Sequence, residues 1–103
     1  MTWRLFIDDE RMPANYSFII ARNSYDAIWM MQAYGLPIEI AFDHDLGGDD
    51  TAMKVVAYLE ELVRIKEQPL PKNFVYSVHS QNPVGKRNII AAMQNIISWS
   101  NTL

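Results

Sequence analysis

Hydrophobic and polar positions along the chain predict four strands that alternate with three helices. Short runs of β-branched and aromatic residues predict strands at residues 3–7, 16–21, 38–42 and 74–78. Apolar residues spaced three or four apart predict helices at residues 25–34, about 51–68 and about 83–99. Because strands that alternate with helices favour right-handed crossovers, we expect an α/β fold with a mainly parallel sheet.

Polar residues mark the beginnings of the predicted helices. Ser24 is the expected N-cap of the first helix. Asp49, Asp50 or Thr51 is the expected N-cap of the second helix, after the flexible turn at Gly47 and Gly48. Aspartate at the amino end of a helix is favourable, so capping is the leading interpretation of the acidic pair at 49–50.

Length and composition predict a single domain over residues 1–103. Half of the 103 residues are hydrophobic, which is enough to fill a core. The chain has no cysteine, so disulfides and thiolate metal sites are excluded. The lack of cysteine is consistent with a protein of a reducing compartment. Without a signal segment or a membrane-spanning run we expect a cytoplasmic protein, in the host cytoplasm if a phage encodes it. The net charge of −3 argues against general DNA binding.

Acidic residues follow two of the predicted strands directly. Asp8 and Asp9 come after the first strand, and Asp43 comes after the third. The functional crevice of a parallel sheet lies beyond the carboxyl ends of its strands, so these carboxylates converge if the two strands are neighbours. Carboxylates at such short distances repel one another. Either the pKa of one of them is raised, or they hold a cation. Oxygen ligands without thiolates suit magnesium, manganese or calcium.

Both histidines of the chain lie at the same predicted edge. His44 stands between two aspartates, and His79 ends the fourth strand with Ser80 and Asn82 beside it. A histidine, a metal and short hydrogen-bond donors can support acid–base chemistry at a phosphate. The alternative for His44 is an ordinary polar surface or core residue.

Basic residues near this edge are candidates for binding an anion. Lys86 and Arg87 fall in the first turn of the last predicted helix, where the helix dipole disfavours positive charge. Their presence there indicates an anion nearby, and the alternative is two solvated basic side chains. Arg11 is a weaker candidate of the same kind.

Three sequence motifs resemble those of a known family. They are Phe-Ile-Asp-Asp-Glu-Arg at residues 6–11, Phe-Asp-His-Asp-Leu-Gly-Gly-Asp-Asp-Thr-Ala at 42–52, and Val-His-Ser-Gln-Asn-Pro-Val-Gly at 78–85. The chain resembles, from Trp3 to about Ile97, the cyclic-phosphate-processing receiver-like domains of bacteria and phages, within the response-regulator receiver superfamily. The resemblance implies a small three-layer, flavodoxin-like fold with a mainly parallel four-stranded sheet, reduced relative to ordinary receivers.

The resemblance also implies roles for individual residues. The residues that match its metal-binding pair and phosphoacceptor, and that we expect to bind metal, are Asp8, Asp9 and Asp43. The residues that match its added motifs, and that we expect to be catalytic, are His79, His44 and Asp45. The residues that we expect to bind phosphate beside them are Ser80, Asn82, Lys86 and Arg11.

The chain departs from ordinary receivers in ways that disfavour aspartyl-phosphate signalling. His79 stands where receivers carry a serine or threonine, and the lysine after a fifth strand has no counterpart. A short loop, residues 11–15, replaces the first helix of receivers.

Three functional hypotheses follow from these residues and the resemblance. The leading hypothesis is a phosphoesterase that uses Mg²⁺ or Mn²⁺ and acts on a cyclic nucleotide or on an RNA end with a cyclic phosphate. The alternative is a non-catalytic module that binds a nucleotide or a protein partner, and the third is phosphoacceptance at Asp43. An open sheet edge would also allow a homodimer.

Overall fold

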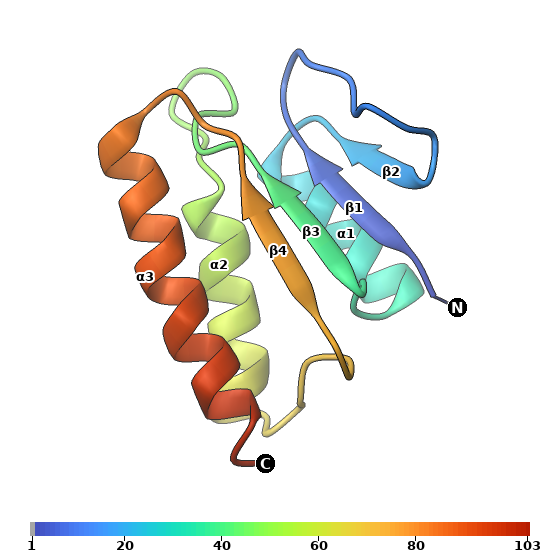
Figure 1. Ribbon diagram of the computed structural model, residues 1–103, viewed down its shortest axis with the longest axis vertical. Coiled ribbons are helices and arrows are strands. Elements are labelled where there is room, and N and C mark those ends of the chain that lie inside the picture. The colour runs from blue at the N-terminus through green and yellow to red at the C-terminus, as the bar shows by residue number, and fades with distance from the viewer. Residues whose placement is uncertain (1) are drawn as a thin grey trace.

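The computed structural model describes residues 2–103 and contains one sheet packed against helices (Figure 1). Its strands are β1 (Arg4–Ile7), β2 (Phe18–Ala21), β3 (Glu39–Phe42) and β4 (Val75–Val78). Its helices are α1 (Ser24–Tyr34), α2 (Met53–Glu60), the π-helical turn η1 (Glu61–Ile65) that continues α2, and α3 (Pro83–Ser100). All predicted strands and helices are present, with small differences at their ends.

The four strands are parallel and lie in the order β2-β1-β3-β4. Strands β1 and β3 are therefore neighbours, and Ile7 is in register with Phe42. The pairing continues one residue further, because the Asp43 amide donates to the Ile7 carbonyl at 2.9 Å. Asp8 and Asp43 consequently leave the sheet side by side.

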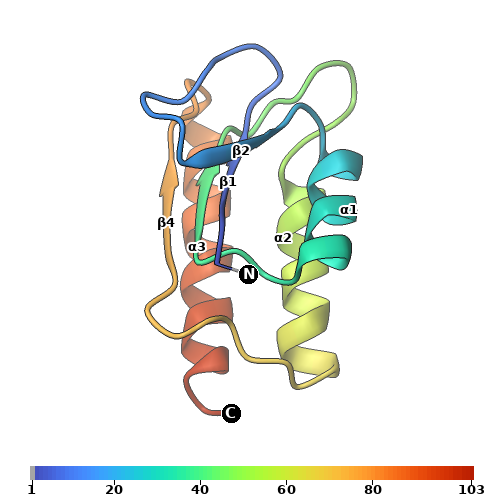
Figure 2. The ribbon, with the colours of Figure 1, turned by 90° about the vertical axis from the view of Figure 1, so that its right-hand side faces the viewer.

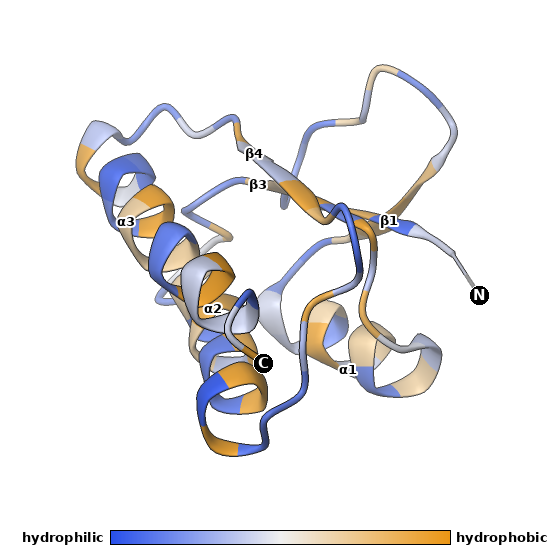
Figure 3. Cartoon of the chain, turned by 60° about the horizontal axis from the view of Figure 1, so that its bottom comes forward, coloured by the Kyte–Doolittle hydropathy of each residue, from blue (hydrophilic) through white to orange (hydrophobic). Residues whose placement is uncertain are grey.

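All three helices lie on one face of the sheet (Figures 2 and 3). The chain crosses the sheet in one direction from β2 to β3 and from β3 to β4, and right-handed crossovers in one direction place their helices on one side. The connection from β1 to β2 runs the opposite way and is a loop, residues 8–17. The receiver-like α/β class and its parallel four-stranded sheet are thus confirmed, but residues 2–103 form two layers rather than the expected three.

The core lies between the helices and the face of the sheet that they cover. Side chains of β1 and β3 that point to the helices are fully buried: Leu5, Ile7, Ile40 and Phe42. Those of the helices that meet them are also buried: Val55, Val56, Leu59, Ile89 and Met93. Burying an aliphatic or aromatic side chain of this size stabilises the fold by roughly 1.5–3 kcal/mol. Within residues 2–103, none of the helices has both the length and the apolar character needed to cross a bilayer.

The N-caps of α1 and α2 are not the predicted residues. The N-cap of α1 is Asn23 rather than Ser24, since its Oδ1 accepts a hydrogen bond from an amide of the first turn at 2.7 Å. Asp50 accepts hydrogen bonds from the amide and hydroxyl of Ser24 at 2.8 and 2.5 Å, so it binds α1 instead of capping α2. The N-cap of α2 is Ala52 rather than Asp49, Asp50 or Thr51, although the Thr51 hydroxyl accepts from the Met53 amide at 3.3 Å.

Candidate functional site

Three carboxylates meet at the carboxyl edge of β1 and β3. One oxygen from each of Asp8, Asp9 and Asp43 lies within 4.8 Å of the others. Asp8 is fully buried and Asp43 is 6% exposed, so two of the three charges are largely removed from water. The structure therefore brings together the three aspartates that the sequence predicts to share a site.

The Asp8 carboxylate is held by three hydrogen bonds and one ion pair. Its Oδ1 accepts from the amides of Glu10 and Arg11 at 2.9 and 2.8 Å. Its Oδ2 lies 3.0 Å from His79 Nε2 and 3.4 Å from Arg11 Nε. Burial raises the pKa of Asp8, but these hydrogen bonds and the Arg11 charge outweigh burial, and the pKa lies below its ordinary value. Asp8 is thus an ionised group in a fixed orientation.

Asp43 is in the opposite electrostatic state. Burial and the negative charge of Asp8 raise its pKa, while the hydrogen bond from the His44 amide at 2.9 Å and the charges of Arg11 and His79 act against them. The net direction is upward, so the charge of Asp43 is disfavoured where it stands. A cation at this position would relieve that repulsion.

The donor set fits a hard divalent cation. Carboxylate oxygens are the ligands that Mg²⁺, Mn²⁺ and Ca²⁺ prefer in proteins. Oxygens on opposite sides of Mg²⁺ lie about 4.2 Å apart, because each bond is about 2.1 Å long. Three ligands of one octahedral ion include at most one opposite pair, and neighbouring ligands lie about 3.0 Å apart. The three oxygens, within 4.8 Å of one another, would therefore have to move closer together around such an ion. Within residues 2–103 no other cluster of three ligand-type side chains meets this spacing.

A chain of hydrogen bonds orients His44. Its Nδ1 lies 3.0 Å from Asp45 Oδ1, and Asp45 Oδ2 accepts from Asn82 Nδ2 at 3.2 Å. These hydrogen bonds from His44 and Asn82 lower the pKa of Asp45. The His44 ring packs on Gly85, where an added Cβ would lie 2.3 Å from Cγ of the ring. The ring is therefore held on one side by a carboxylate and on another by the backbone of α3.

His79 reaches the cluster from β4 and lies flat on an aromatic ring. Its imidazole stacks on Phe6 with a centroid distance of 4.8 Å and an interplanar angle of 6°. This stacking aims Nε2 at Asp8, and the His79 carbonyl accepts from Arg11 Nη1 at 3.0 Å. Phe6 is not among the predicted site residues, because a phenylalanine inside a strand is usually a core residue.

Most of the chain matches a known protein family. Residues 3–95 of the 103 match the family described as the cyclic-phosphate processing receiver domain. The chain belongs to this family. The family description implies a role in cyclic-phosphate processing on a receiver scaffold. Comparison with curated proteins and with solved structures gives no match.

The residues predicted to bind phosphate differ in how many of their side-chain polar atoms already have hydrogen-bond partners. The Asn82 side chain is engaged at both ends, since its Oδ1 accepts from the Gly85 amide at 3.0 Å and its Nδ2 donates to Asp45. The Ser80 hydroxyl accepts from the Asn82 amide at 3.1 Å and keeps its own proton to donate. Lys86 is exposed on the first turn of α3. Phosphate binding by these residues stays a prediction.

The loop between β3 and α2 is closed on itself beside the cluster. The Leu46 amide donates to the Asp50 carbonyl at 3.0 Å, and Leu46 is buried. Gly47 has a φ of +93°, which a residue with a side chain rarely adopts, and a Cβ there would lie 3.6 Å from Asp9 Oδ2. The glycine pair therefore forms a tight turn next to the third carboxylate of the site.

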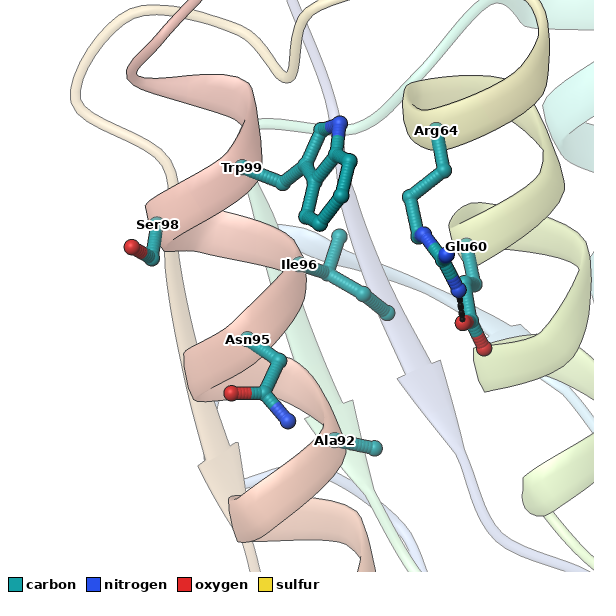
Figure 4. Close-up of a pocket in the computed structure, with 7 residues that line it drawn as sticks. All are labelled: Glu60, Arg64, Ala92, Asn95, Ile96, Ser98 and Trp99. Carbon is teal, nitrogen blue, oxygen red and sulfur yellow. Dashed lines mark hydrogen bonds and ion pairs between the residues drawn. The ribbon is translucent and has the colours of Figure 1, made fainter.

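A separate pocket of about 420 Å³ lies between α3 and the α2–η1 helix (Figure 4). There the Arg64 guanidinium lies 4.7 Å from the centre of the Trp99 ring and 2.6 Å from Glu60. These residues are at the carboxyl ends of their helices, whereas the acidic cluster faces the amino ends. This pocket is therefore distinct from the candidate site.

Proposed function

We propose that this receiver domain is a metal-dependent phosphoesterase that opens a cyclic phosphate, in a cyclic nucleotide or at an RNA end. The observation that supports the proposal most strongly is the meeting of three carboxylates within 4.8 Å, with His79 in contact with one of them. Family membership supports the cyclic-phosphate part of the proposal. Its cofactor is Mg²⁺ or Mn²⁺.

In this proposal Asp8, Asp9 and Asp43 hold the divalent ion. The upward direction of the Asp43 pKa supports this assignment, since burial and the neighbouring charge of Asp8 both disfavour its ionised form and a cation would offset them. When bound, the ion would supply a Lewis acid for a phosphoryl oxygen.

His44 is the group that we assign to proton transfer. Asp45 is ionised, so it accepts a hydrogen bond, and the 3.0 Å contact therefore needs a proton on His44 Nδ1. That tautomer, assigned from the hydrogen-bond pattern, leaves Nε2 free to accept or donate a proton. Asn82 keeps Asp45 in place by donating to its second oxygen. A carboxylate likewise orients the histidine of a hydrolase triad by accepting a hydrogen bond from its Nδ1.

His79 is the group that we assign to holding Asp8. Its Nε2 is already committed to Asp8 Oδ2 at 3.0 Å, and stacking on Phe6 fixes the ring. Arg11, with a side chain that is 46% exposed, and Lys86 on the first turn of α3 are the groups that we assign to binding the phosphate oxygens.

The chemistry balances as a hydrolysis. The oxygen of a water molecule bonds to phosphorus while one phosphorus–oxygen bond of the ring breaks. The water loses a proton to a base, and the released alkoxide gains a proton from an acid. The product is a phosphate monoester with a free hydroxyl, and His44 can fill both roles in turn.

A binding module without turnover is the second candidate, and one observation favours it. Asp8 has a full set of donors from Arg11, His79 and the backbone without any cation. Such a module would bind a nucleotide or a protein partner at the same edge.

The experiment is product analysis with cyclic mononucleotides, cyclic dinucleotides and RNA that ends in a cyclic phosphate. Each is incubated with Mg²⁺ or Mn²⁺ and again with chelator, using wild type, His44→Ala and the control Arg64→Ala. We expect ring opening that chelator abolishes, that His44→Ala loses and that Arg64→Ala keeps. Binding of a cyclic nucleotide without product would favour the second candidate instead.

A further inference from the structure

The loop between β1 and β2 lacks the packing that would normally hold a site loop. It replaces a helix, and its side chains Met12 and Tyr16 are 65% and 103% exposed. Yet this loop carries Asp9, the Glu10 and Arg11 amides that bind Asp8, and the Arg11 guanidinium. Some contact other than a buried core must fix its shape.

Arg22, the first residue after β2, makes that contact. Its Nη1 donates to the carbonyl of Asp8 at 3.0 Å and to the carbonyl of Arg11 at 2.6 Å. Its Nη2 lies 3.1 Å from the sulfur of Met12. One guanidinium thus joins the end of β2 to both ends of the turn that runs from Asp8 to Arg11. A rigid, planar fork of donors is suited to bridging several acceptors in this way.

We propose that Arg22 is a positioning residue that sets the geometry of the Asp8–Arg11 turn and, through that turn, of the cation and phosphate ligands. The inference rests on the proposed function for the role of the site, but the contacts of Arg22 with the loop stand without it. Arg22 does not itself bind substrate in this account, because its guanidinium is committed to acceptors of the loop. Its effect reaches the site through Asp9 and the Arg11 side chain.

The position of Arg22 explains why the effect is local. The core cluster of the protein does not include the loop, so loss of the Arg22 hydrogen bonds (the Arg22 clamp) leaves the packing of β1 and β3 intact. What changes is the turn that donates two amide hydrogen bonds to Asp8. Partners that orient ligands typically change metal affinity by about 10–100-fold when they are removed.

The test compares Arg22→Ala and Arg22→Lys with wild type and with the control Arg4→Ala. Arg4 is also paired and partly exposed, but its partner is Glu39 on the open sheet face. Mn²⁺ affinity is measured by calorimetry without substrate, together with hydrogen exchange of the Glu10 and Arg11 amides and with thermal unfolding of the metal-free protein.

We expect Arg22→Ala to weaken Mn²⁺ binding about tenfold and to speed exchange of the two amides by at least about tenfold. The unfolding temperature should stay near that of Arg4→Ala. Arg22→Lys should recover part of both effects, since an ammonium can still donate to the two carbonyls. Wild-type exchange and affinity in Arg22→Ala would overturn the proposal, as would losses that only follow a lowered unfolding temperature.

The two readouts separate this proposal from the proposed function. A wild-type protein that binds no Mn²⁺ would refute the metal site. Amide exchange would then still show whether Arg22 holds the Asp8–Arg11 turn. Faster exchange in Arg22→Ala supports this role, and unchanged exchange overturns it.

Discussion

Replacing Gly85 by alanine tests whether the position of His44 matters for the chemistry. Gly85 lies in the first turn of α3, and an added Cβ would come within 2.3 Å of His44 Cγ and 2.6 Å of Nδ1. Real Cβ atoms do not approach other atoms so closely, so the imidazole must rotate away. That movement breaks the 3.0 Å contact between Nδ1 and Asp45. The backbone of α3 can stay in place because alanine is a good helix former.

Three energies contribute to the effect of this substitution on stability. Alanine in place of glycine stabilises a helix by about 0.5–1 kcal/mol. Loss of one hydrogen bond costs about 0.5–1.5 kcal/mol, less where the pair is exposed as Asp45 is. The close contact with His44 Cγ adds an overpacking cost of about 1–3 kcal/mol. We therefore expect the free energy of unfolding to fall by about 1–3 kcal/mol, while a misplaced acid–base group slows turnover by about 10²–10⁴-fold.

The assay combines urea unfolding, turnover on a substrate identified by product analysis, and the imidazole resonances of the two histidines. The matched control is Asn88→Ala, an exposed position one turn further along α3. We expect Gly85→Ala to shift the His44 resonances, to leave those of His79 in place and to lose turnover. Asn88→Ala should leave the resonances of both histidines and the turnover unchanged. If Gly85→Ala keeps the wild-type rate although the His44 resonances shift, the role of His44 in proton transfer is refuted.

Other predictions concern the aspartates. Asp43→Asn should raise the free energy of unfolding at pH 7 without divalent cations, and urea titrations should show this gain shrinking as pH falls through the raised pKa of Asp43, where wild type becomes neutral too. Divalent cation at about 100 times its Kd should stabilise wild type by about 2.7 kcal/mol and Asp43→Asn far less, as thermal unfolding would show. Asp50→Asn should destabilise the fold by about 1 kcal/mol at pH 7. Burial raises the pKa of Asp50, but hydrogen bonds from Ser24 and Lys54 outweigh burial, and the pKa lies below its ordinary value. The stabilisation by ionised Asp50 is therefore present above the unfolded pKa of about 3.9 and disappears as pH falls through the lower folded pKa. An Asp50→Asn protein as stable as wild type at pH 7, or a stability difference that does not shrink as pH falls below the unfolded pKa, would contradict this.

The sequence predicts the parts of the site that depend on strand order. Asp8 and Asp43 each follow a strand of buried apolar residues, and parallel strands bring their carboxyl ends to one edge. Once β1 and β3 are neighbours, the meeting of the two carboxylates follows from the register alone. The family resemblance is confirmed over residues 3–95.

The contacts between side chains from distant loops could not be predicted in this way. The stacking of His79 on Phe6 and the clamp of Arg22 on the Asp8–Arg11 turn join residues far apart in the chain, at positions with no periodic pattern. The cap of α1 was misassigned for the same reason, because the Ser24 hydroxyl is used by Asp50 from another loop. The layer count depends on the direction of each crossover, which strand patterns do not specify.

A crystal grown with Mn²⁺ and measured near the manganese absorption edge tests the central claim most directly. The account predicts one anomalous peak bonded to carboxylate oxygens of Asp8, Asp9 and Asp43, and loss of that peak in Asp43→Asn. No peak at saturating Mn²⁺, with Asp8 still bound only to His79, Arg11 and the backbone, would contradict it.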